Sequence, residues 1–266
     1  MGDSGQVTQS AAEKYDELFP SALFNEWAPR VAELAGVGPG MRVLDVACGT
    51  GVLSLVAADL VKPGGSVVGL DLNSGMLDVA RRKAPHIDWH EAPAEAIPFE
   101  DGTFDAVVSQ FGLMFFQDKA LGIREMLRVL RPAGKLAVAV WDSLENVAGY
   151  AAASELLGRL FGDSAAESLR APHSLGDVQN LSSLFSDAGA PDIKITTLDG
   201  KARYPSMRYW MEADIRGWTL ADVLDDAQFE RLVSEAESQL ARFVTDDGTV
   251  EFSNLAHIVT ATKRAG

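Results

Sequence analysis

The feature that most constrains the fold of this chain is a short apolar run that ends in an acid and leads into a tight glycine turn. Residues 43–51 are Val-Leu-Asp-Val-Ala-Cys-Gly-Thr-Gly, so Asp45 lies near the end of the run and Gly49 and Gly51 form the turn. A second apolar run, residues 66–70, follows and ends in Asp71, about twenty residues after the turn. Two buried strands joined by a helix at this spacing predict a doubly wound, Rossmann-like α/β fold.

The same alternation of apolar strands and amphipathic helices continues along the chain. It predicts a mostly parallel seven-stranded sheet in a single domain over residues 1–266, with an N-terminal helical lid at 11–36 and a helical cap insertion at 201–250. The expected strands are residues 42–47, 66–71, 87–90, 104–110, 135–141, 193–198 and 255–262. The expected helices are residues 11–19, 22–35, 52–60, 74–83, 120–130, 146–161 and 177–188, followed by two within the cap.

The glycine turn and the acid that ends the second strand together predict a nucleoside cofactor. Asp71 is placed to accept hydrogen bonds from ribose hydroxyls, with a helix N-cap as its alternative role. A dinucleotide site would carry a third glycine where this chain has Ser54. Asp45 would repel a pyrophosphate but attract the sulfonium and ammonium groups of S-adenosylmethionine (SAM). Electrostatics therefore favours SAM over NAD.

Five sequence blocks between residues 41 and 141 resemble, in order, the motifs of class I SAM-dependent methyltransferases. The subgroup with the most similar pattern contains the ubiquinone and menaquinone C-methyltransferases. The resemblance implies in-line transfer of a methyl group from SAM to an O or C atom of a small, aromatic or apolar acceptor, with S-adenosylhomocysteine as product. The blocks are residues 43–51, 69–77, 95–99, 104–113 and 125–136.

The resemblance also assigns cofactor contacts by position. Asp45 would meet the amino-acid end of SAM and Gln110 the methionine portion, with loop capping as the alternative for Gln110. Tyr15 lies where related enzymes close a lid over SAM, and an aromatic core position is its alternative. The full set of expected cofactor residues is Tyr15, Asp45, Ala47, Gly49, Gly51, Asp71, Leu72, Met76, Ala94, Glu95, Gln110 and Phe111.

One segment departs from the family's pattern. Related enzymes commonly carry Gly-Asp-Ala before a Glu-x-x-Pro-Phe segment, and that Asp accepts a hydrogen bond from the adenine amino group. This chain has Ala92-Pro93-Ala94 there, so adenine recognition is expected to depend on the Ala94 backbone and on Glu95. Weaker cofactor affinity, or a compensating contact elsewhere, would follow from this change.

The acceptor site leaves fewer signals, because a methyltransferase mainly positions and desolvates its acceptor. Trp27, Trp210 and Trp218 are candidates for an aromatic pocket, with core packing as the alternative for each. His173 is the candidate general base, with a solvated loop position as its alternative. No set of His, Cys and acidic residues has metal-ligand spacing, so no metal is expected. The sequence leaves O- or C-methylation and the oligomeric state open.

Composition narrows the class of partner. A net charge of −15 argues against nucleic acid, because phosphate binding needs a basic surface. The chain lacks an apolar stretch of about 18 residues and a secretory signal, so a cytoplasmic enzyme with no membrane span and a small-molecule acceptor is expected. Cys48, the single cysteine, is expected to be a small residue that fits the turn and not a nucleophile.

Two other functions stay open at this point. An NAD-dependent oxidoreductase would use the same fold class, although Asp45 and the missing third glycine disfavour it. A non-catalytic SAM-binding protein would keep the nucleoside site without a productive acceptor pocket.

Overall fold

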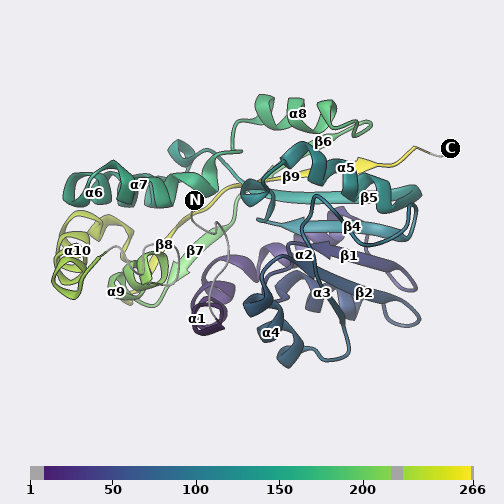
Figure 1. Ribbon diagram of the computed structural model, residues 1–266. Coiled ribbons are helices and arrows are strands. Elements are labelled where there is room, and N and C mark those ends of the chain that lie inside the picture. The colour runs from purple at the N-terminus through teal and green to yellow at the C-terminus, as the bar shows by residue number, and fades with distance from the viewer. Residues whose placement is uncertain (1–8, 217–223, 265–266) are drawn as a thin grey trace.

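The computed structural model describes residues 9–216 and 224–264. Its centre is a seven-stranded sheet with the order β3-β2-β1-β4-β5-β9-β6, in which β9 alone runs antiparallel to its neighbours (Figure 1). This confirms the predicted doubly wound, mostly parallel sheet. The strands are β1 (Arg42–Val46), β2 (Ser66–Asp71), β3 (Asp88–Glu91), β4 (Phe104–Gln110), β5 (Leu130–Trp141), β6 (Lys194–Leu198) and β9 (Ala256–Thr262).

Central strands are buried on both faces, as their continuous apolar sequences require. Ala106, Val107 and Val108 of β4 are fully buried, and β1 and β5 flank them. The helices that cover the sheet are α2 (Trp27–Leu34), α3 (Val52–Leu60) and α4 (Ser74–Lys83) on one side, and α5 (Lys119–Val129) and α8 (Val178–Asp187) on the other (Figure 1). Because β2 and β4 both pair in parallel with β1, the carboxyl ends of the three strands lie together on one side of the sheet.

The N-terminal segment differs in detail from the single helix expected over residues 22–35. Helix α1 (Gln9–Phe19) ends directly before Pro20, a π-helical turn covers Pro20–Phe24, and α2 begins only at Trp27. Proline has no N–H to donate into the preceding turn, which explains the break. Helix α1 packs along α4 and is tied to it by ion pairs from Arg82 to Glu13 (2.7 Å) and from Lys83 to Asp16 (2.6 Å).

A second group of elements, here called the cap lobe, lies beside the sheet (left in Figure 1). Part of it comes from the expected cap at residues 201–250, where the structure contains a two-stranded antiparallel sheet that the sequence did not predict. Residues 217–223, with Trp218, lie outside the described residues. The cap lobe consists of α6 (Ala148–Phe161), α7 (Asp163–Arg170), β7 (Lys201–Tyr204), α9 (Met207–Met211), a π-helical turn (Glu212–Arg216), α10 (Asp226–Gln239) and β8 (Val250–Ser253).

The cap lobe has an aromatic core of its own. Trp210 contacts Tyr204, Tyr150 and Phe252, with ring centroids 5.8, 6.2 and 4.8 Å apart. Trp27 is fully buried beneath the sheet edge, where it meets Phe111 edge-on. Core packing, the alternative role expected for Trp27 and Trp210, is therefore the one observed.

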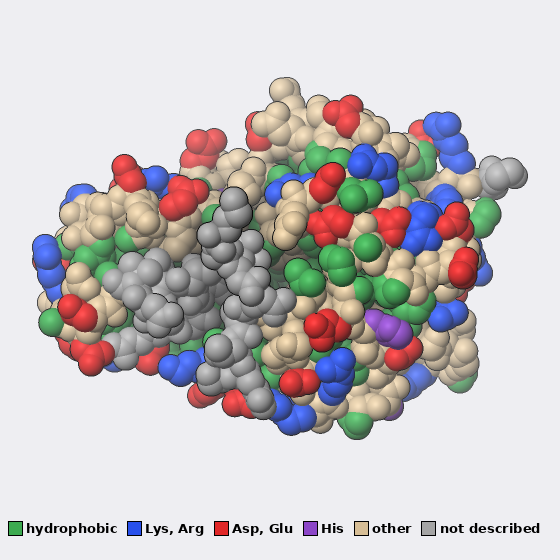
Figure 2. Space-filling model, viewed as in Figure 1, with side chains coloured by type: hydrophobic (Ala, Val, Ile, Leu, Met, Phe, Trp, Pro, Cys, Tyr) green, Lys and Arg blue, Asp and Glu red, His purple; other side chains and the backbone are tan. Residues whose placement is uncertain are grey.

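The described surface carries mixed charge. Acidic and basic side chains alternate over the face that Figure 2 presents. Within residues 9–216 and 224–264, every helix is too short or too polar to cross a bilayer.

Candidate active site

The turn after β1 holds a buried acid with an unused hydrogen-bonding atom. Asp45 is 1% exposed, and its Oδ2 accepts a hydrogen bond from Ser54 Oγ at 2.6 Å. Its Oδ1 is buried and has no hydrogen-bond partner among the residues that the structure describes. Burial raises the pKa of Asp45 to about 7, and the Ser54 hydrogen bond opposes this only in part. A buried carboxylate oxygen without a partner costs free energy, so the site favours a ligand that brings a donor or a positive charge.

Asp71 joins the second strand to the glycine turn. Its two carboxylate oxygens accept hydrogen bonds from the backbone N–H groups of Gly49 and Asn73, each at 2.8 Å. The N-cap of α4 is Asn73, whose side chain accepts from Met76 N at 3.1 Å. The helix-cap alternative for Asp71 is therefore filled by another residue, and Asp71 stays at the strand end beside the turn.

The backbone at this edge adopts conformations that L-residues rarely use. Ala47 after β1 and Phe111 after β4 both have φ of 56°. Gly112 allows these two turns to touch, because a Cβ there would lie 2.5 Å from Ala47 Cβ. A Cβ at Gly49 would meet no atom of residues 9–216 or 224–264 within 4 Å, so this part of the turn is uncovered by the described chain. Strain of this kind concentrates at functional sites. We call the region formed by the turns after β1, β2 and β4 the strand-end edge.

Other predicted cofactor residues surround this edge. Leu72 is 44% exposed directly after Asp71, whereas Met76 and Ala94 are buried. Gln110 donates from Nε2 to Phe24 O at 3.3 Å, and its Oε1 is buried with no partner in the described part of the chain. The observed bond fits the expected capping alternative, while the free oxygen leaves the ligand role possible.

The structure gives Glu95 a local function in addition to any ligand role. Its Oε1 accepts hydrogen bonds from the N–H groups of Gln117 and Asp118, at 2.8 and 3.1 Å. The carboxylate thereby fastens the loop that leads into α5. A contact from this side chain to adenine would have to compete with these bonds, so the changed 92–94 segment receives no evident compensation from Glu95.

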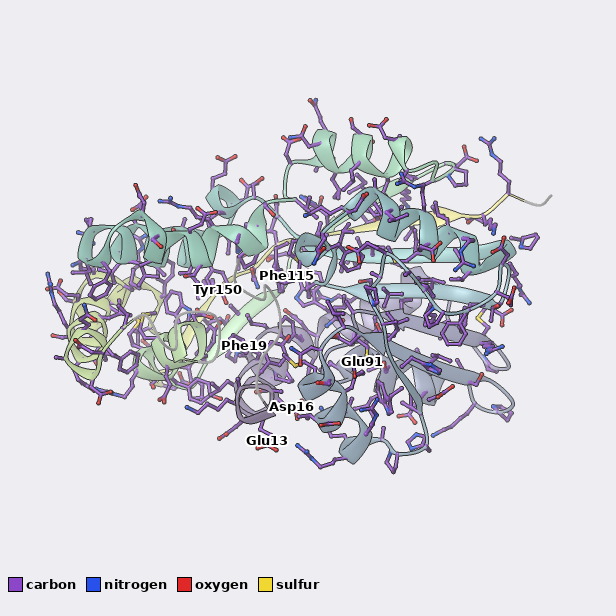
Figure 3. The ribbon with its side chains drawn as sticks, in the orientation of Figure 1. Glu13, Asp16, Phe19, Glu91, Phe115 and Tyr150 are labelled. Carbon is purple, nitrogen blue, oxygen red and sulfur yellow. The ribbon has the colours of Figure 1, made fainter. Side chains whose placement is uncertain are left out.

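An aromatic cavity lies between the strand-end edge and the cap lobe. Phe111 and Trp141, at the ends of β4 and β5, stack with ring centroids 3.5 Å apart and planes 8° apart. Side chains of the N-terminal segment and α6 converge on the same region, as the labelled Phe19, Phe115 and Tyr150 illustrate (Figure 3). The cavity encloses about 70 Å³ and is lined by Tyr15, Phe19, Leu23, Phe24, Phe111, Phe115, Trp141, Tyr150, Ser168, Leu169, Pro172 and Asp214.

The candidate base His173 lies behind this lining. It is buried in a 3-10 turn (Ala171–His173), with its ring 5.7 Å from that of Tyr150. Its Nδ1 is 2.7 Å from the carbonyl oxygen of Asp142, so Nδ1 carries the proton and Nε2 is the bare nitrogen. Burial lowers the pKa of His173. The base assignment stays a prediction, since the ring is not among the cavity-lining groups.

Sequence reasoning missed several lining residues. Trp141 is the last residue of a predicted strand, and an aromatic side chain at a strand's carboxyl end is a signal that was available. Asp214 is one of two acids, with Glu212, in the otherwise apolar and aromatic stretch 209–214. Phe19 and Phe24 sit in the predicted lid helices, where periodicity alone cannot separate a cavity wall from a core position.

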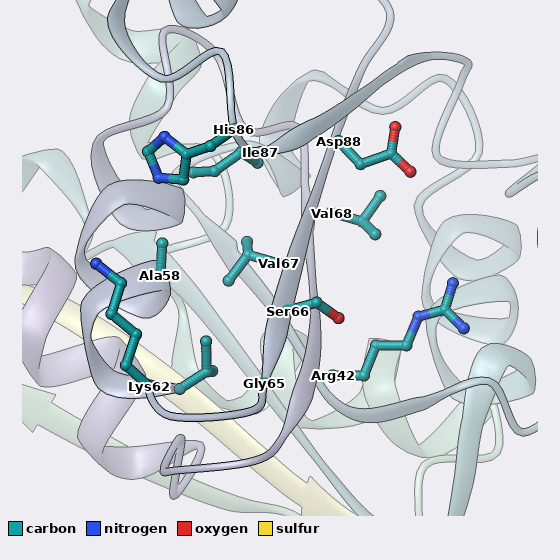
Figure 4. A pocket seen from close by; sticks show the side chains of 11 residues that line it. Arg42, Ala58, Lys62, Gly65, Ser66, Val67, Val68, His86, Ile87 and Asp88 are labelled. Carbon is teal, nitrogen blue, oxygen red and sulfur yellow. The ribbon is translucent and has the colours of Figure 1, made fainter.

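A second depression lies at the opposite end of the sheet (Figure 4). It encloses about 320 Å³ between the amino ends of β1 and β2, with Arg42, Lys62 and His86 among its lining residues. Ligands of doubly wound sheets bind outside the carboxyl ends of the strands. The strand-end edge and the adjoining aromatic cavity are therefore the better candidate for the active site.

Comparison with known proteins identifies the family of this chain. A sequence model described as the ubiE/COQ5 methyltransferase family matches residues 3–201. The chain belongs to the ubiE/COQ5 methyltransferase family. Demethylmenaquinone methyltransferase of Renibacterium salmoninarum is 36% identical over 205 residues, covering 71% of this chain and 84% of that protein. The ubiquinone/menaquinone biosynthesis C-methyltransferase UbiE of Ectopseudomonas mendocina is 42% identical over 142 residues, covering 50% of this chain but only 56% of that protein.

Solved structures share the fold of this family member. The YcgJ protein from Bacillus subtilis superposes with a TM-score of 0.61 at 18% identity, covering 91% of this chain and 99% of that one. Phosphoethanolamine N-methyltransferase 2 of Haemonchus contortus, solved with S-adenosylhomocysteine, gives a TM-score of 0.62 at 20% identity, covering 98% of this chain and 59% of that one. At these identities the likeness establishes the fold.

The protein is thus a SAM-dependent methyltransferase, and SAM is its cofactor. The strand-end edge fits this molecule, because it offers buried, unpartnered oxygens on Asp45 and Gln110 and open space above Gly49. Neither the oxidoreductase nor the non-catalytic alternative receives support from the relatives. Cys48, buried and with a raised pKa, has the character expected of a small turn residue and not of a nucleophile.

Proposed function

We propose that this methyltransferase transfers the methyl group of SAM to a ring carbon of a hydroquinol. The single observation that carries the proposal is the aromatic cavity beside the strand-end edge. Phe111, which directly follows β4, belongs both to the edge and to the cavity lining. Its walls suit a flat, apolar ring, and the relative from Renibacterium salmoninarum is named for demethylmenaquinone. C-methylation is preferred to O-methylation because the UbiE relatives are named C-methyltransferases.

The residues of the strand-end edge would hold the cofactor by complementary charge and hydrogen bonding. Asp45 Oδ1 would accept a hydrogen bond from the ammonium group of SAM. Gln110 Oε1 would offer a second acceptor to the methionine portion of the cofactor, which Gln110 is expected to contact. Asp71 would receive the ribose hydroxyls while its backbone bonds to Gly49 and Asn73 fix its orientation. Leu72, Met76 and Ala94 would provide the adenine surface, and Ala47 and Gly51 the shape of the turn.

When bound, SAM supplies an electrophilic methyl group on a sulfonium. The work of the protein is then to align the acceptor carbon with that methyl group and to exclude water. Phe111 and Trp141 would form the platform for the acceptor ring, because their stack is rigid and lies next to the strand ends. Tyr15 of α1 lines the same cavity and would close it from the N-terminal side.

The cavity as observed is small for this task. Ligand pockets typically measure about 300–1,000 Å³, whereas this one encloses about 70 Å³. Acceptor entry therefore requires the N-terminal segment or the cap lobe to move outward. We assign the lid role to residues 11–36 and the cap role to residues 201–250 on this ground.

The direct test is turnover. The protein is incubated with methyl-deuterated SAM and 1,4-naphthalenediol under reducing conditions, and products are separated and identified by mass spectrometry and NMR. The expected product carries the labelled methyl group on a ring carbon next to a hydroxyl. A methyl ether, or no transfer to this diol and to its 2-alkyl derivatives, would contradict the proposal.

A further inference from the structure

The cap lobe contributes one acid to the otherwise apolar and aromatic cavity. Asp214 lies in the π-helical turn Glu212–Arg216 and lines the cavity, yet its side chain is only 6% exposed. Its Oδ2 is buried without a hydrogen-bond partner among the described residues. A buried carboxyl oxygen without a partner costs free energy, and a ligand group that pairs with it would recover that cost.

The neighbours of Asp214 leave its Oδ2 available within the described part of the chain. Tyr150 and Tyr204 bond to each other through their hydroxyls at 2.6 Å, and burial together with the nearby Asp214 raises the pKa of both. Burial also raises the pKa of Asp214 to about 8, and hydrogen bonding from the side chains of Trp210 and Tyr204 lowers it only in part. Tyr15 from α1 and Ser168 from α7 complete the polar lining, and Ser168 Oγ already donates to Ala165 O at 2.7 Å.

We propose that Asp214 receives the hydroxyl group of the methyl acceptor and takes its proton as the ring carbon is methylated. This inference rests on the proposed function and adds the residue that activates the acceptor. The matched family region ends at residue 201, so Asp214 belongs to the part of the chain that the family pattern does not describe. The acid and the aromatic platform of Phe111 and Trp141 line the same cavity.

The chemistry balances with the groups named. As the O–H proton passes to the Asp214 carboxylate, the oxygen's electron pair enters the ring and the adjacent carbon forms a bond to the methyl group. The sulfur–methyl bond breaks with its electron pair left on sulfur, so S-adenosylhomocysteine is released. The methylated carbon then loses its own hydrogen to water as a proton, and the oxygen regains the proton held by Asp214. One proton leaves overall, and the hydroxyl is restored.

A binding experiment tests the hydroxyl contact without depending on turnover. Calorimetric titration with S-adenosylhomocysteine present compares 1-naphthol with 1-methoxynaphthalene, which has the same ring but no donor. At a pH above about 8, where Asp214 is ionised, wild type is expected to bind the naphthol at least about tenfold more tightly, as a charge-assisted hydrogen bond predicts. The preference should fall to about threefold or less in Asp214→Asn and disappear in Asp214→Leu. Equal binding of the two probes by wild type, or an unchanged preference in both variants, overturns the inference.

Turnover supplies the second readout. Asp214→Asn should lower kcat/KM for 1,4-naphthalenediol by about 100-fold or more, in the range of general-base catalysis, with affinity for S-adenosylhomocysteine unchanged. Glu212→Gln, two residues away on the same turn but not lining the cavity, is the matched control and should keep both properties. Asp214→Asn is expected to fold at least as well as wild type, because it removes a buried, unpartnered acid.

The two proposals fail in different ways. A hydroxyl preference that depends on Asp214, without any ring methylation, would contradict the hydroquinol proposal and support the contact. Ring methylation with full rate in Asp214→Asn would support the hydroquinol proposal and overturn the role of Asp214.

Discussion

The strand-end edge and the aromatic cavity adjoin each other, yet they are built on opposite principles. The edge consists of short turns directly after β1, β2 and β4, with positive φ angles and buried polar atoms. The cavity has walls from the N-terminal segment, two strand ends, α6, α7 and the cap lobe, and its lining is mainly apolar. In the proposed function the first is a polar cradle for the cofactor, whereas the second, which is assembled from distant segments, would open to admit an acceptor. This difference predicts that mutations in the two regions will separate cofactor binding from acceptor use.

The largest effect is expected at the edge. Asp45→Ala should weaken SAM binding about 100-fold or more, because the buried carboxylate would meet the ammonium group in a site shielded from water. Calorimetry with SAM and S-adenosylhomocysteine measures this loss. Asp59→Ala, on the exposed end of α3, is the control and should bind normally. An Asp45→Ala protein with wild-type affinity would remove the electrostatic basis of the account.

The glycine turn should be sensitive to a single methyl group. Gly51 has φ of 87°, and a Cβ there would lie 2.7 Å from the Trp89 ring. Gly51→Ala should lower the free energy of unfolding by about 2–4 kcal/mol, through backbone strain and overpacking. Gly40→Ala shares the positive φ, 80°, but meets no atom within 4 Å, so it should cost only about 1–2 kcal/mol. Denaturant unfolding of both variants measures the difference, and equal losses would mean that Trp89 yields freely.

Substitutions in the cavity lining should change KM for the acceptor and leave the affinity for SAM unchanged. Phe115 lines the cavity and is 50% exposed, so Phe115→Ala should raise KM for the acceptor about 5- to 10-fold while SAM affinity and thermal stability change little. Leu60→Ala, which removes a 40% exposed apolar side chain far from the cavity on α3, is the control. A loss of SAM affinity in Phe115→Ala with unchanged KM would reverse the assignment of the two regions.

The smallest effect is a pH dependence set by Asp45. Its pKa is about 7 in the fold and about 3.9 in an unfolded chain, so the folded state holds the extra proton between these values. The contribution of Asp45 to the free energy of unfolding is therefore fully present below about pH 4 and is lost as pH rises through about 7. Without SAM, Asp45→Asn should gain a few °C of Tm relative to wild type between pH 5 and pH 8. A Tm difference independent of pH would contradict the burial of an ionisable acid at this turn.

The same contrast explains what could be predicted from sequence. The strands of the parallel half and the residues of the glycine turn follow from local patterns, and the expected strand at 104–110 matches β4 to the residue. The shift of the third strand from 87–90 to Asp88–Glu91 is a boundary difference of one residue. The proposed cofactor contacts Asp45, Asp71 and Gln110 lie at or near the carboxyl ends of β1, β2 and β4. Because parallel strands end together, the sequence alone was enough to predict that these residues lie close to one another.

The cap lobe was less predictable for a physical reason. Strands β7 and β8 are four residues each and pair across about fifty residues of sequence, so their partner is set by tertiary packing and not by local pattern. Trp210 is a core residue and Trp141 a cavity wall, although nothing in the local sequence around either residue distinguishes the two roles. Asp214 could be identified only after the cavity was seen, because its burial depends on elements from three parts of the chain.

One crystal structure would test the central claim most directly, that of the complex with S-adenosylhomocysteine and 1-naphthol. The account predicts the ammonium group about 3 Å from Asp45 Oδ1, the naphthol ring in the aromatic cavity against Phe111 and Trp141, and its hydroxyl on Asp214. A cofactor whose amino-acid end avoids Asp45, or a naphthol bound outside the cavity, would contradict the division of the site into a polar cofactor edge and an aromatic acceptor cavity.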